Sequence, residues 1–380
     1  MSRIGKSLLA FLYIISALLL GGCGLRDQAR EAEELLVVQT LGCDTRRGGV
    51  RVSLASAAGG GADGSPARLT GEGPSITAAI ERIRAGADEE TLFCAHIGHL
   101  LVGEQTAREG LALCLDYVCR SGELRLSVPL YVLRGAEARE AVLSVGDESF
   151  GVCDALDSVD ADLRGRSDGR CFTAAEILRD LERQGGALVC AVRLQSSAER
   201  PAAAEAAPQT LLADGYAVLR EGRLCGFLDR EEAAAVGLIE GLSGLCEVTV
   251  SDQAGLPATL TLTGGSCALE PDFDEQGRLA SLGFAVEAEA QLSELAAEDT
   301  EPDYLRRMLE RALAERVRGV LRLSQRLDCD FLGLGARLER QEPRAMHAQE
   351  RPFAALWPEL PLRVSVTARL AGAGGLEIEP

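Results

Sequence analysis

Aromatic residues are scarce in this sequence of 380 residues. They make up 4% of it, and Trp357 is the single tryptophan. A protein with so few aromatic rings must build its core mainly from Leu, Val, Ile and Ala. Aromatic platforms on which the bases of single-stranded nucleic acid could stack are therefore not expected.

Lysine is nearly absent, since Lys6 is the only one in the chain. The 58 acidic residues outnumber the 39 basic ones, which leaves a formal net charge of −19. A surface of this sign repels the phosphate backbone of nucleic acids. Neither DNA nor RNA is therefore an expected partner.

Signatures of catalysis and cofactor binding are also lacking. The sequence contains no Gly-x-Ser-x-Gly, His-Glu-x-x-His, phosphate loop or Cys-x-x-Cys. His96 and His99 would face opposite sides of a strand and could not share a metal. The Gly333-Leu334-Gly335 segment lacks the third glycine of a dinucleotide loop, and Asp328 with Asp330 is interpreted as a turn. We expect no catalytic, cofactor-binding or metal site, and no enzymatic activity.

The first residues have the organisation of an export signal. Arg3 and Lys6 precede an apolar run over residues 7–20, and a Leu-Gly-Gly tripeptide then leads to Cys23. The run is shorter than the roughly 20 apolar residues that a transmembrane helix needs. The pattern resembles a bacterial lipobox and predicts a signal peptide over residues 1–22 and a lipid-anchored Cys23. Two alternative interpretations remain, an uncleaved membrane anchor and an ordinary signal peptide that a cysteine follows by chance.

Eleven cysteines follow Cys23, so at least one stays unpaired even under full oxidation. Cys43, Cys94, Cys190 and Cys246 lie in apolar or alternating runs, where cysteine behaves as a small hydrophobic residue. This placement favours buried thiols. Disulfide bonds remain the alternative, because an extracellular location favours oxidation.

Hydrophobic residues make up 47% of the chain and charged residues 26%, which is typical of a globular protein. Predicted helices and strands alternate irregularly, so we expect an α+β, mixed α/β ectodomain of several domains with separate sheets. Residues 196–209, rich in alanine and proline, are interpreted as a linker between an N-terminal domain over residues 23–195 and a C-terminal domain over residues 210–380. Each half is expected to carry its own sheet.

Three further expectations concern individual segments. Residues 104–120 are predicted to form one helix, and residues 147–170 to be polar and irregular. The longest predicted helix covers residues 302–327, with an apolar stripe expected to pack on the second sheet. Its opposite face carries a basic strip that is either solvated or a contact for partner carboxylates. The strip consists of Arg307, Arg311, Arg318 and Arg322.

Several segments in a fixed order carry a family resemblance. They are Leu92-Phe93-Cys94-Ala95-His96-Ile97-Gly98-His99-Leu100-Leu101-Val102-Gly103-Glu104, the Leu-Gly-Cys43-Asp44 strand end, Asp330-Phe331-Leu332-Gly333-Leu334-Gly335, and Trp357-Pro358-Glu359-Leu360-Pro361. Their order behind the lipobox resembles the Ger(x)C family, the lipoprotein subunits of nutrient germinant receptors in spore-forming bacteria. Departures are the Gly24-Leu25 that follows Cys23 and the exchanged order of Phe353 and Trp357.

The resemblance implies a non-catalytic protein on the outer leaflet of the inner spore membrane, where it assembles with two polytopic membrane subunits. The complex would respond to amino acids, sugars or nucleosides. The family fold has three domains, which implies a further boundary near Asp147. The alternative function is a lipid-anchored extracytoplasmic solute-binding protein of a transporter. That class needs two similar lobes around a cleft, and the sequence shows no internal repeat.

Overall fold

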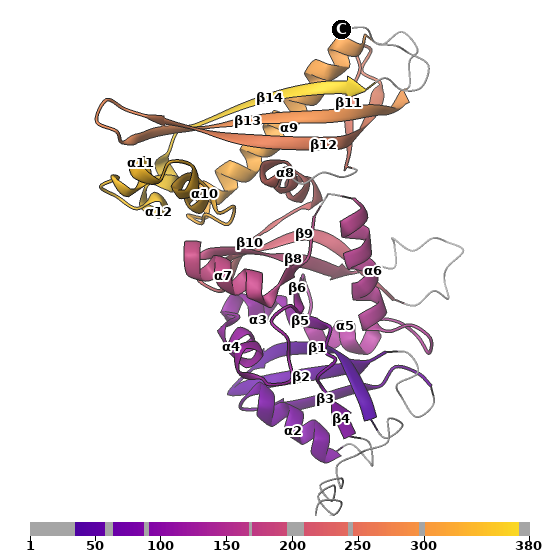
Figure 1. Cartoon of the computed structure of the whole chain (residues 1–380). Helices are drawn as coiled ribbons and strands as arrows, with labels where there is room; N and C mark the ends of the chain where they lie inside the picture. Colours follow the sequence, from indigo (N-terminus) through magenta and orange to yellow (C-terminus); the bar gives the residue numbers. More distant parts are fainter. Residues whose placement is uncertain are drawn as a thin grey trace, which may run out of the picture.

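The computed structural model describes residues 35–57, 64–86, 91–166, 169–195, 209–241, 246–295 and 301–371. The expected signal peptide, Cys23 and residues 196–208 of the expected linker lie outside the described residues. The described strands form two separate sheets, and Figure 1 shows the second sheet lying across one end of the unit built on the first. The expected α+β class with separate sheets is confirmed.

The described strands of the first sheet are β1 Leu35–Arg46, β2 Gly49–Ser56, β3 Arg68–Gly73, β4 Thr91–Phe93, β5 His99–Gly103, β6 Pro129–Leu133, β7 Phe172–Thr173, β8 Gly186–Leu194, β9 Leu211–Arg220 and β10 Arg223–Leu228. Their order is β10-β9-β8-β6-β5-β1-β2-β3, with β4 beside β1 and β7 beside β6. The second sheet has the order β11-β12-β13-β14. Its strands are β11 Cys246–Ser251, β12 Pro257–Phe273, β13 Leu279–Leu295 and β14 Leu362–Ala371.

The described helices of the first unit are α2 Ile76–Gly86, α3 Glu104–Glu109, α4 Ala112–Arg120, α5 Ala138–Ser144, α6 Val152–Gly165 and α7 Ala174–Gln184. Helix α8, Arg230–Glu240, lies between the two sheets (Figure 1). The second unit contains α9 Pro302–Arg326, α10 Leu334–Gln341, α11 Pro343–His347, α12 Phe353–Leu356 and the short 3₁₀ helix η5 Trp357–Glu359.

Helices cover both faces of the first sheet, because alternate side chains of a strand reach opposite faces. On β5, Leu100 and Val102 belong to the apolar cluster that includes side chains of α2, α4 and α7. Leu101 belongs to the cluster formed with α5 and α6. The first cluster continues through α8 into the second unit, where it includes Phe284 and Trp357. The two units therefore share one continuous core.

The first sheet does not end where the linker was expected. Strand β8, before residues 196–208, pairs antiparallel with β9, which follows them. Strands β9 and β10 thus belong to the first sheet, and the expectation that each half carries its own sheet is wrong. A domain boundary at residues 196–209 would divide this sheet, because strands on both sides of it pair with each other.

Two helix predictions also need correction. Residues 147–170 are not irregular, because they contain α6, which buries Val152, Leu156, Val159 and Leu163 along one face. The predicted helix over residues 104–120 is two helices, α3 and α4. It breaks at Gly110, whose φ of 127° is not helical.

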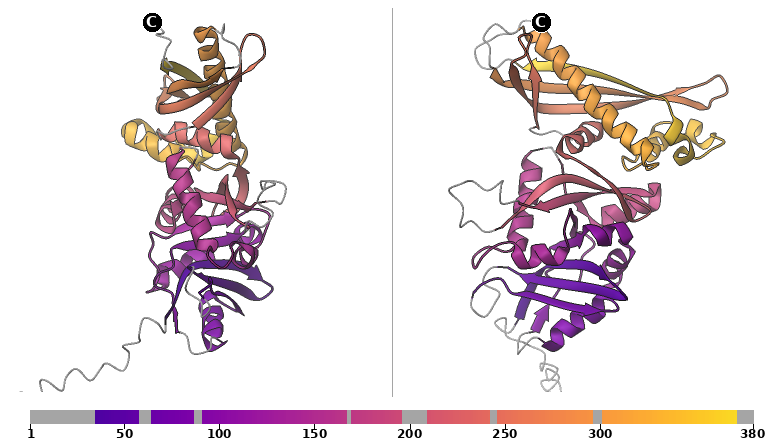
Figure 2. Two further views of the ribbon diagram at one scale, coloured as in Figure 1. Left: turned by 90° about the vertical axis from the view of Figure 1, so that its right-hand side faces the viewer. Right: turned by 180° about the vertical axis from the view of Figure 1, so that it is seen from behind.

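The long helix α9 crosses the second sheet diagonally, as Figure 2 shows from behind. Its apolar stripe, including Leu305, Leu309 and Leu313, packs on that sheet, as expected. Side chains of α9 also bond to the backbone of the edge strand β14. Glu310 accepts a hydrogen bond from the N–H of Ala368 at 3.0 Å, and Arg318 donates to the carbonyl of Val364 at 3.1 Å. Arg318 is therefore not part of a solvated basic strip.

Asp44, the last residue of the Leu-Gly-Cys43-Asp44 segment, connects strand β1 to the start of helix α5. Its buried carboxylate accepts hydrogen bonds from the backbone N–H groups of Ala138 and Arg139 at 2.8 and 2.9 Å. These donors open α5, where they have no partner within the helix. Gly103 leaves room for this carboxylate, because a Cβ there would collide with it. The segment therefore supplies, from strand β1, the residue that caps helix α5.

Replacing Asp44 with alanine should lower the free energy of unfolding by about 1–3 kcal/mol, since buried donors would lose their acceptor. Urea unfolding of residues 25–380 measures this change. The control is Asp116→Ala, which removes an exposed carboxylate paired with Arg120 and should cost less than about 1 kcal/mol. Equal effects of the two substitutions would contradict the capping role.

Candidate functional site

The histidines singled out in the sequence do not form a site. His96 is exposed, whereas His99 is buried. The Nε2 of His99 lies 3.1 Å from an oxygen of Asp157, and its ring lies 5.8 Å from that of Tyr131. Burial lowers the pKa of His99, although the charge of Asp157 opposes this effect. Within the described residues, no group of three or more His, Cys, Asp or Glu side chains could hold a metal ion.

The Asp330 to Gly335 segment is a turn built around one carboxylate. Asp330 is buried and accepts hydrogen bonds at 2.9 Å from the N–H groups of Leu334 and Gly335, at the start of α10. Gly333 has a φ of 65°, which favours glycine. Gly335 lies so close to Phe353 that a Cβ would come within 2.7 Å of its ring. The glycines are needed for backbone geometry and close packing.

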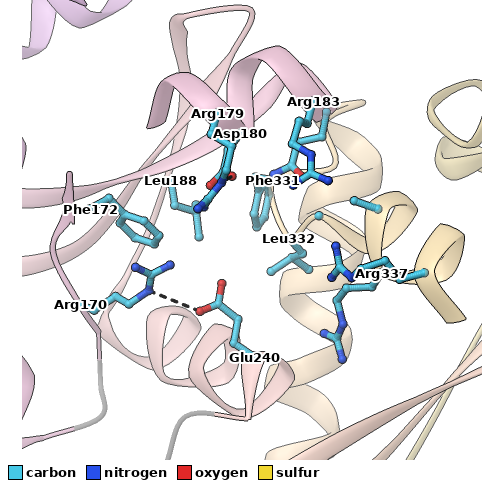
Figure 3. Close-up of a pocket in the computed structure, with 14 residues that line it drawn as sticks. Arg170, Phe172, Arg179, Asp180, Arg183, Leu188, Glu240, Phe331, Leu332 and Arg337 are labelled. Carbon is cyan, nitrogen blue, oxygen red and sulfur yellow. Dashed lines mark hydrogen bonds and ion pairs between the residues drawn. The ribbon is translucent and has the colours of Figure 1, made fainter. Parts of the chain in front are cut away.

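This turn lines an open pocket of about 730 Å³ between the two units. Helix α7 supplies one wall, while Phe331, Leu332 and α10 supply the opposite wall. Glu240, at the end of α8, points into the pocket between Arg170 and Leu332 (Figure 3). The polar lining consists of Arg170, Arg179, Asp180, Arg183, Gln184, Glu240, Arg337 and Arg340.

Arg170 is held in place on three sides. It donates to Glu176 at 2.8 Å, lies 3.7 Å from a carboxylate oxygen of Glu240, and stacks 4.0 Å from the ring centre of Phe172. Burial alone would lower the pKa of Arg170, but the hydrogen bond with Glu176 and the charge of Glu240 raise it. Burial raises the pKa of Glu240, and Arg170 opposes that rise.

Arg337 joins α10 to α8 and to the second sheet. One guanidinium nitrogen donates to the carbonyl of Ile239 at 2.8 Å and another to that of Cys267 at 3.2 Å. The pocket thus holds five arginines and two carboxylates in a strongly acidic protein. Its lining residues include no histidine, cysteine, serine or lysine. Such a surface can hold an anionic group by forked hydrogen bonds.

Comparisons with known proteins identify the family. A family model described as the spore germination protein N-terminal domain matches residues 28–145, and one described as spore germination B3/GerAC-like, C-terminal, matches residues 214–374. The chain belongs to the Ger(x)C family of spore germination proteins.

The Ger(x)C fold is found again in a solved structure. The crystal structure of the GerBC protein matches with a TM-score of 0.57 and 16% sequence identity, over 87% of this chain and 97% of that one. At this identity the match supports the fold alone. The search of curated protein sequences found no significant match. In the ranges that the structure describes, no helix is long and apolar enough to cross a membrane.

The pocket of this Ger(x)C protein was not predicted from the sequence. Four of its five arginines lie on α7 and α10, where they look like ordinary solvated charges, and Arg170 lies just before β7. The sequence signal that could have led to it is the Asp330 to Gly335 segment, which supplies part of one wall. Of the four cysteines singled out, Cys43, Cys94 and Cys190 are buried thiols and Cys246 is half-buried.

The burial of Asp330 predicts that the stability of the protein depends on pH. Burial raises its pKa despite the backbone hydrogen bonds that oppose the rise. The folded protein therefore binds this proton more tightly than the unfolded chain, so the stabilisation is complete below about pH 4 and is lost as pH rises through the folded pKa.

The substitution Asp330→Asn removes the ionisable carboxyl group. The free energy of unfolding of the natural chain minus that of the variant should fall as pH increases from about 4 towards 7. Urea unfolding of both proteins at several pH values measures this difference. A difference that rises with pH would show that the pKa of Asp330 is lowered instead.

Proposed function

We propose that this chain is the lipoprotein C subunit of a spore nutrient germinant receptor. A diacylglycerol on Cys23 anchors it to the outer face of a membrane, which in the spore is the inner membrane. The subunit is non-catalytic and contributes to receptor assembly or signalling with two polytopic membrane subunits. The observation that carries the proposal is the family match over both parts of the chain, which begins at residue 28, just after the lipobox.

The architecture favours this role over that of a solute-binding protein. A binding protein of a transporter closes two similar lobes around its ligand. Here the described strands form a ten-stranded mixed sheet in one unit and a four-stranded sheet in the other. The pocket between the units is also open and not enclosed by two lobes. Micromolar binding of a nutrient to residues 25–380 without any partner would instead favour the transporter alternative.

Cys23 is the residue on which anchoring depends. Cys23→Ala should abolish acylation, because only the thiol can accept the lipid through a thioether, and it should lower retention in the membrane fraction. Incorporation of labelled palmitate and fractionation measure both effects. Cys119→Ala, at an exposed cysteine, is the matched control and should keep the label. A Cys23→Ala variant that is cleaved yet stays fully membrane-bound would show that protein contacts hold it instead.

The basic strip on α9 is the surface to test for partner contact, with Arg318 left out because it bonds to Val364. Arg307 and Arg311 are exposed. Reversing both charges, in Arg307→Glu and Arg311→Glu, should reduce co-purification with the two membrane subunits. The midpoint of thermal unfolding should hardly change, since exposed charges contribute roughly 0–1 kcal/mol each.

The matched control reverses two exposed charges on the first unit, Arg120→Glu and Arg125→Glu. This control should co-purify like the natural chain. If both double variants co-purify fully, the α9 strip is not the contact surface, although the receptor role would still stand on the family match.

A further inference from the structure

Two cysteines that are far apart in the sequence meet where the units join. Cys225 lies on β10, and Cys329 lies in the turn after α9. Cys225 donates to the carbonyl of Val218 at 3.3 Å, and Cys329 donates to the carbonyl of the next residue of β9, Leu219, at 3.4 Å. Contact with Cys329 also lowers the pKa of Cys225, and contact with Cys225 raises that of Cys329. Two distant parts of the chain thus bring their thiols to neighbouring carbonyl groups of β9.

The fold fixes the position of Cys329. Its sulfur lies where β8 has no side chain, since a Cβ at Gly186 would come within 2.5 Å of it. The residues before it are held by Arg220, which donates to Asp328 at 2.7 Å and to the carbonyl of Leu327 at 3.1 Å. The turn after it is held by the carboxylate of Asp330. Contacts on both sides of Cys329 therefore hold its thiol at the carbonyl of Leu219, next to the residue that Cys225 contacts.

Elsewhere in the described structure a neighbouring thiol raises the pKa of two further cysteines, Cys114 that of Cys43 and Cys171 that of Cys190. Both pairs lie within the first unit. The pair of Cys225 and Cys329 is different, because it connects a strand of the first sheet to the end of the helix that covers the second sheet.

We propose that Cys225 and Cys329 form a disulfide bond in the exported protein, which fastens the end of α9 to β10. The inference depends on export, because disulfides persist in oxidising compartments and not in the cytosol. Cys225 is half-buried, and a cavity of about 580 Å³ lies beside Cys329, so an oxidant can approach from the side of either cysteine.

The chemistry is thiol–disulfide exchange with an acceptor of the disulfide class. The thiolate of Cys225 attacks a sulfur of the acceptor, whose other sulfur leaves as a thiolate, and a mixed disulfide forms. The thiolate of Cys329 then attacks the Cys225 sulfur and releases the second half of the acceptor. The protein loses two protons and two electrons, and the acceptor becomes two thiols. The contact with Cys329 lowers the pKa of Cys225, which favours this order of attack.

The bond would close a long loop of the chain and thereby restrict the unfolded state. It would also limit relative movement of the two units, because it crosses their junction beside the arginine-lined pocket. Reduction would restore that freedom without changing any surface residue.

The test maps the bond in the full chain. Membranes from cells that express it are quenched with acid, alkylated with N-ethylmaleimide without reduction, and digested. We expect mass spectrometry to find a cross-linked peptide containing Cys225 and Cys329, which disappears when dithiothreitol precedes alkylation. Both cysteines carrying the alkyl group without prior reduction would overturn the proposal. Acylation of Cys23 in the same sample reports export separately, so a missing bond in acylated protein leaves the receptor role untouched.

Variants supply the controls. Cys225→Ser and Cys329→Ser should each remove the cross-linked peptide, whereas Cys119→Ser should keep it. In the natural chain, dithiothreitol should lower the midpoint of thermal unfolding by several degrees. The decrease should be smaller in the Cys225→Ser/Cys329→Ser double variant, and an equal decrease would show that this pair forms no bond.

Discussion

The junction of the two units depends on the buried carboxylate of Asp330. Removing a carboxylate from water is costly, and it is tolerated because the N–H groups of Leu334 and Gly335 point at it. The turn fixed in this way buries Phe331 and Leu332 in the core shared with the first sheet. It also starts α10, from which Arg337 reaches carbonyl groups of α8 and of β12. The same turn thus supplies part of the pocket wall and part of the core that the two units share.

Arginine serves this junction in a way that lysine could not. Arg220 donates to the side chain of Asp328 and to the carbonyl of Leu327, while Arg337 donates to two carbonyls from different elements. The planar guanidinium holds two acceptors in fixed directions, whereas an ammonium acts as a compact point charge. In a chain with a single lysine, arginine therefore supplies the polar connections between units as well as its exposed positive charge.

Helix caps depend on residues close together in the sequence, whereas strand pairing joins distant segments. Thr173 with Glu176 and Asp229 with Glu232 form capping boxes, because a cap depends on residues three positions apart. The pairing of β8 with β9 could not be predicted, since composition alone suggested a boundary between them. Helix α6 was not predicted because many of its residues are polar, although four apolar residues recur at helical spacing. The lipobox is a contiguous pattern, whereas the pocket combines residues from distant elements.

The contacts between α9 and β14 have a consequence for self-association. A bare edge strand offers a template on which another chain can add a strand, and this is a route to aggregation. On β14, the N–H of Ala368 and the carbonyl of Val364 are already bonded to charged side chains of α9. An incoming strand would have to displace both charged partners before it could pair there. With the anchor proposed on Cys23, the protein would be concentrated in the plane of a membrane and would meet copies of itself often, so a covered edge would help to keep those encounters reversible.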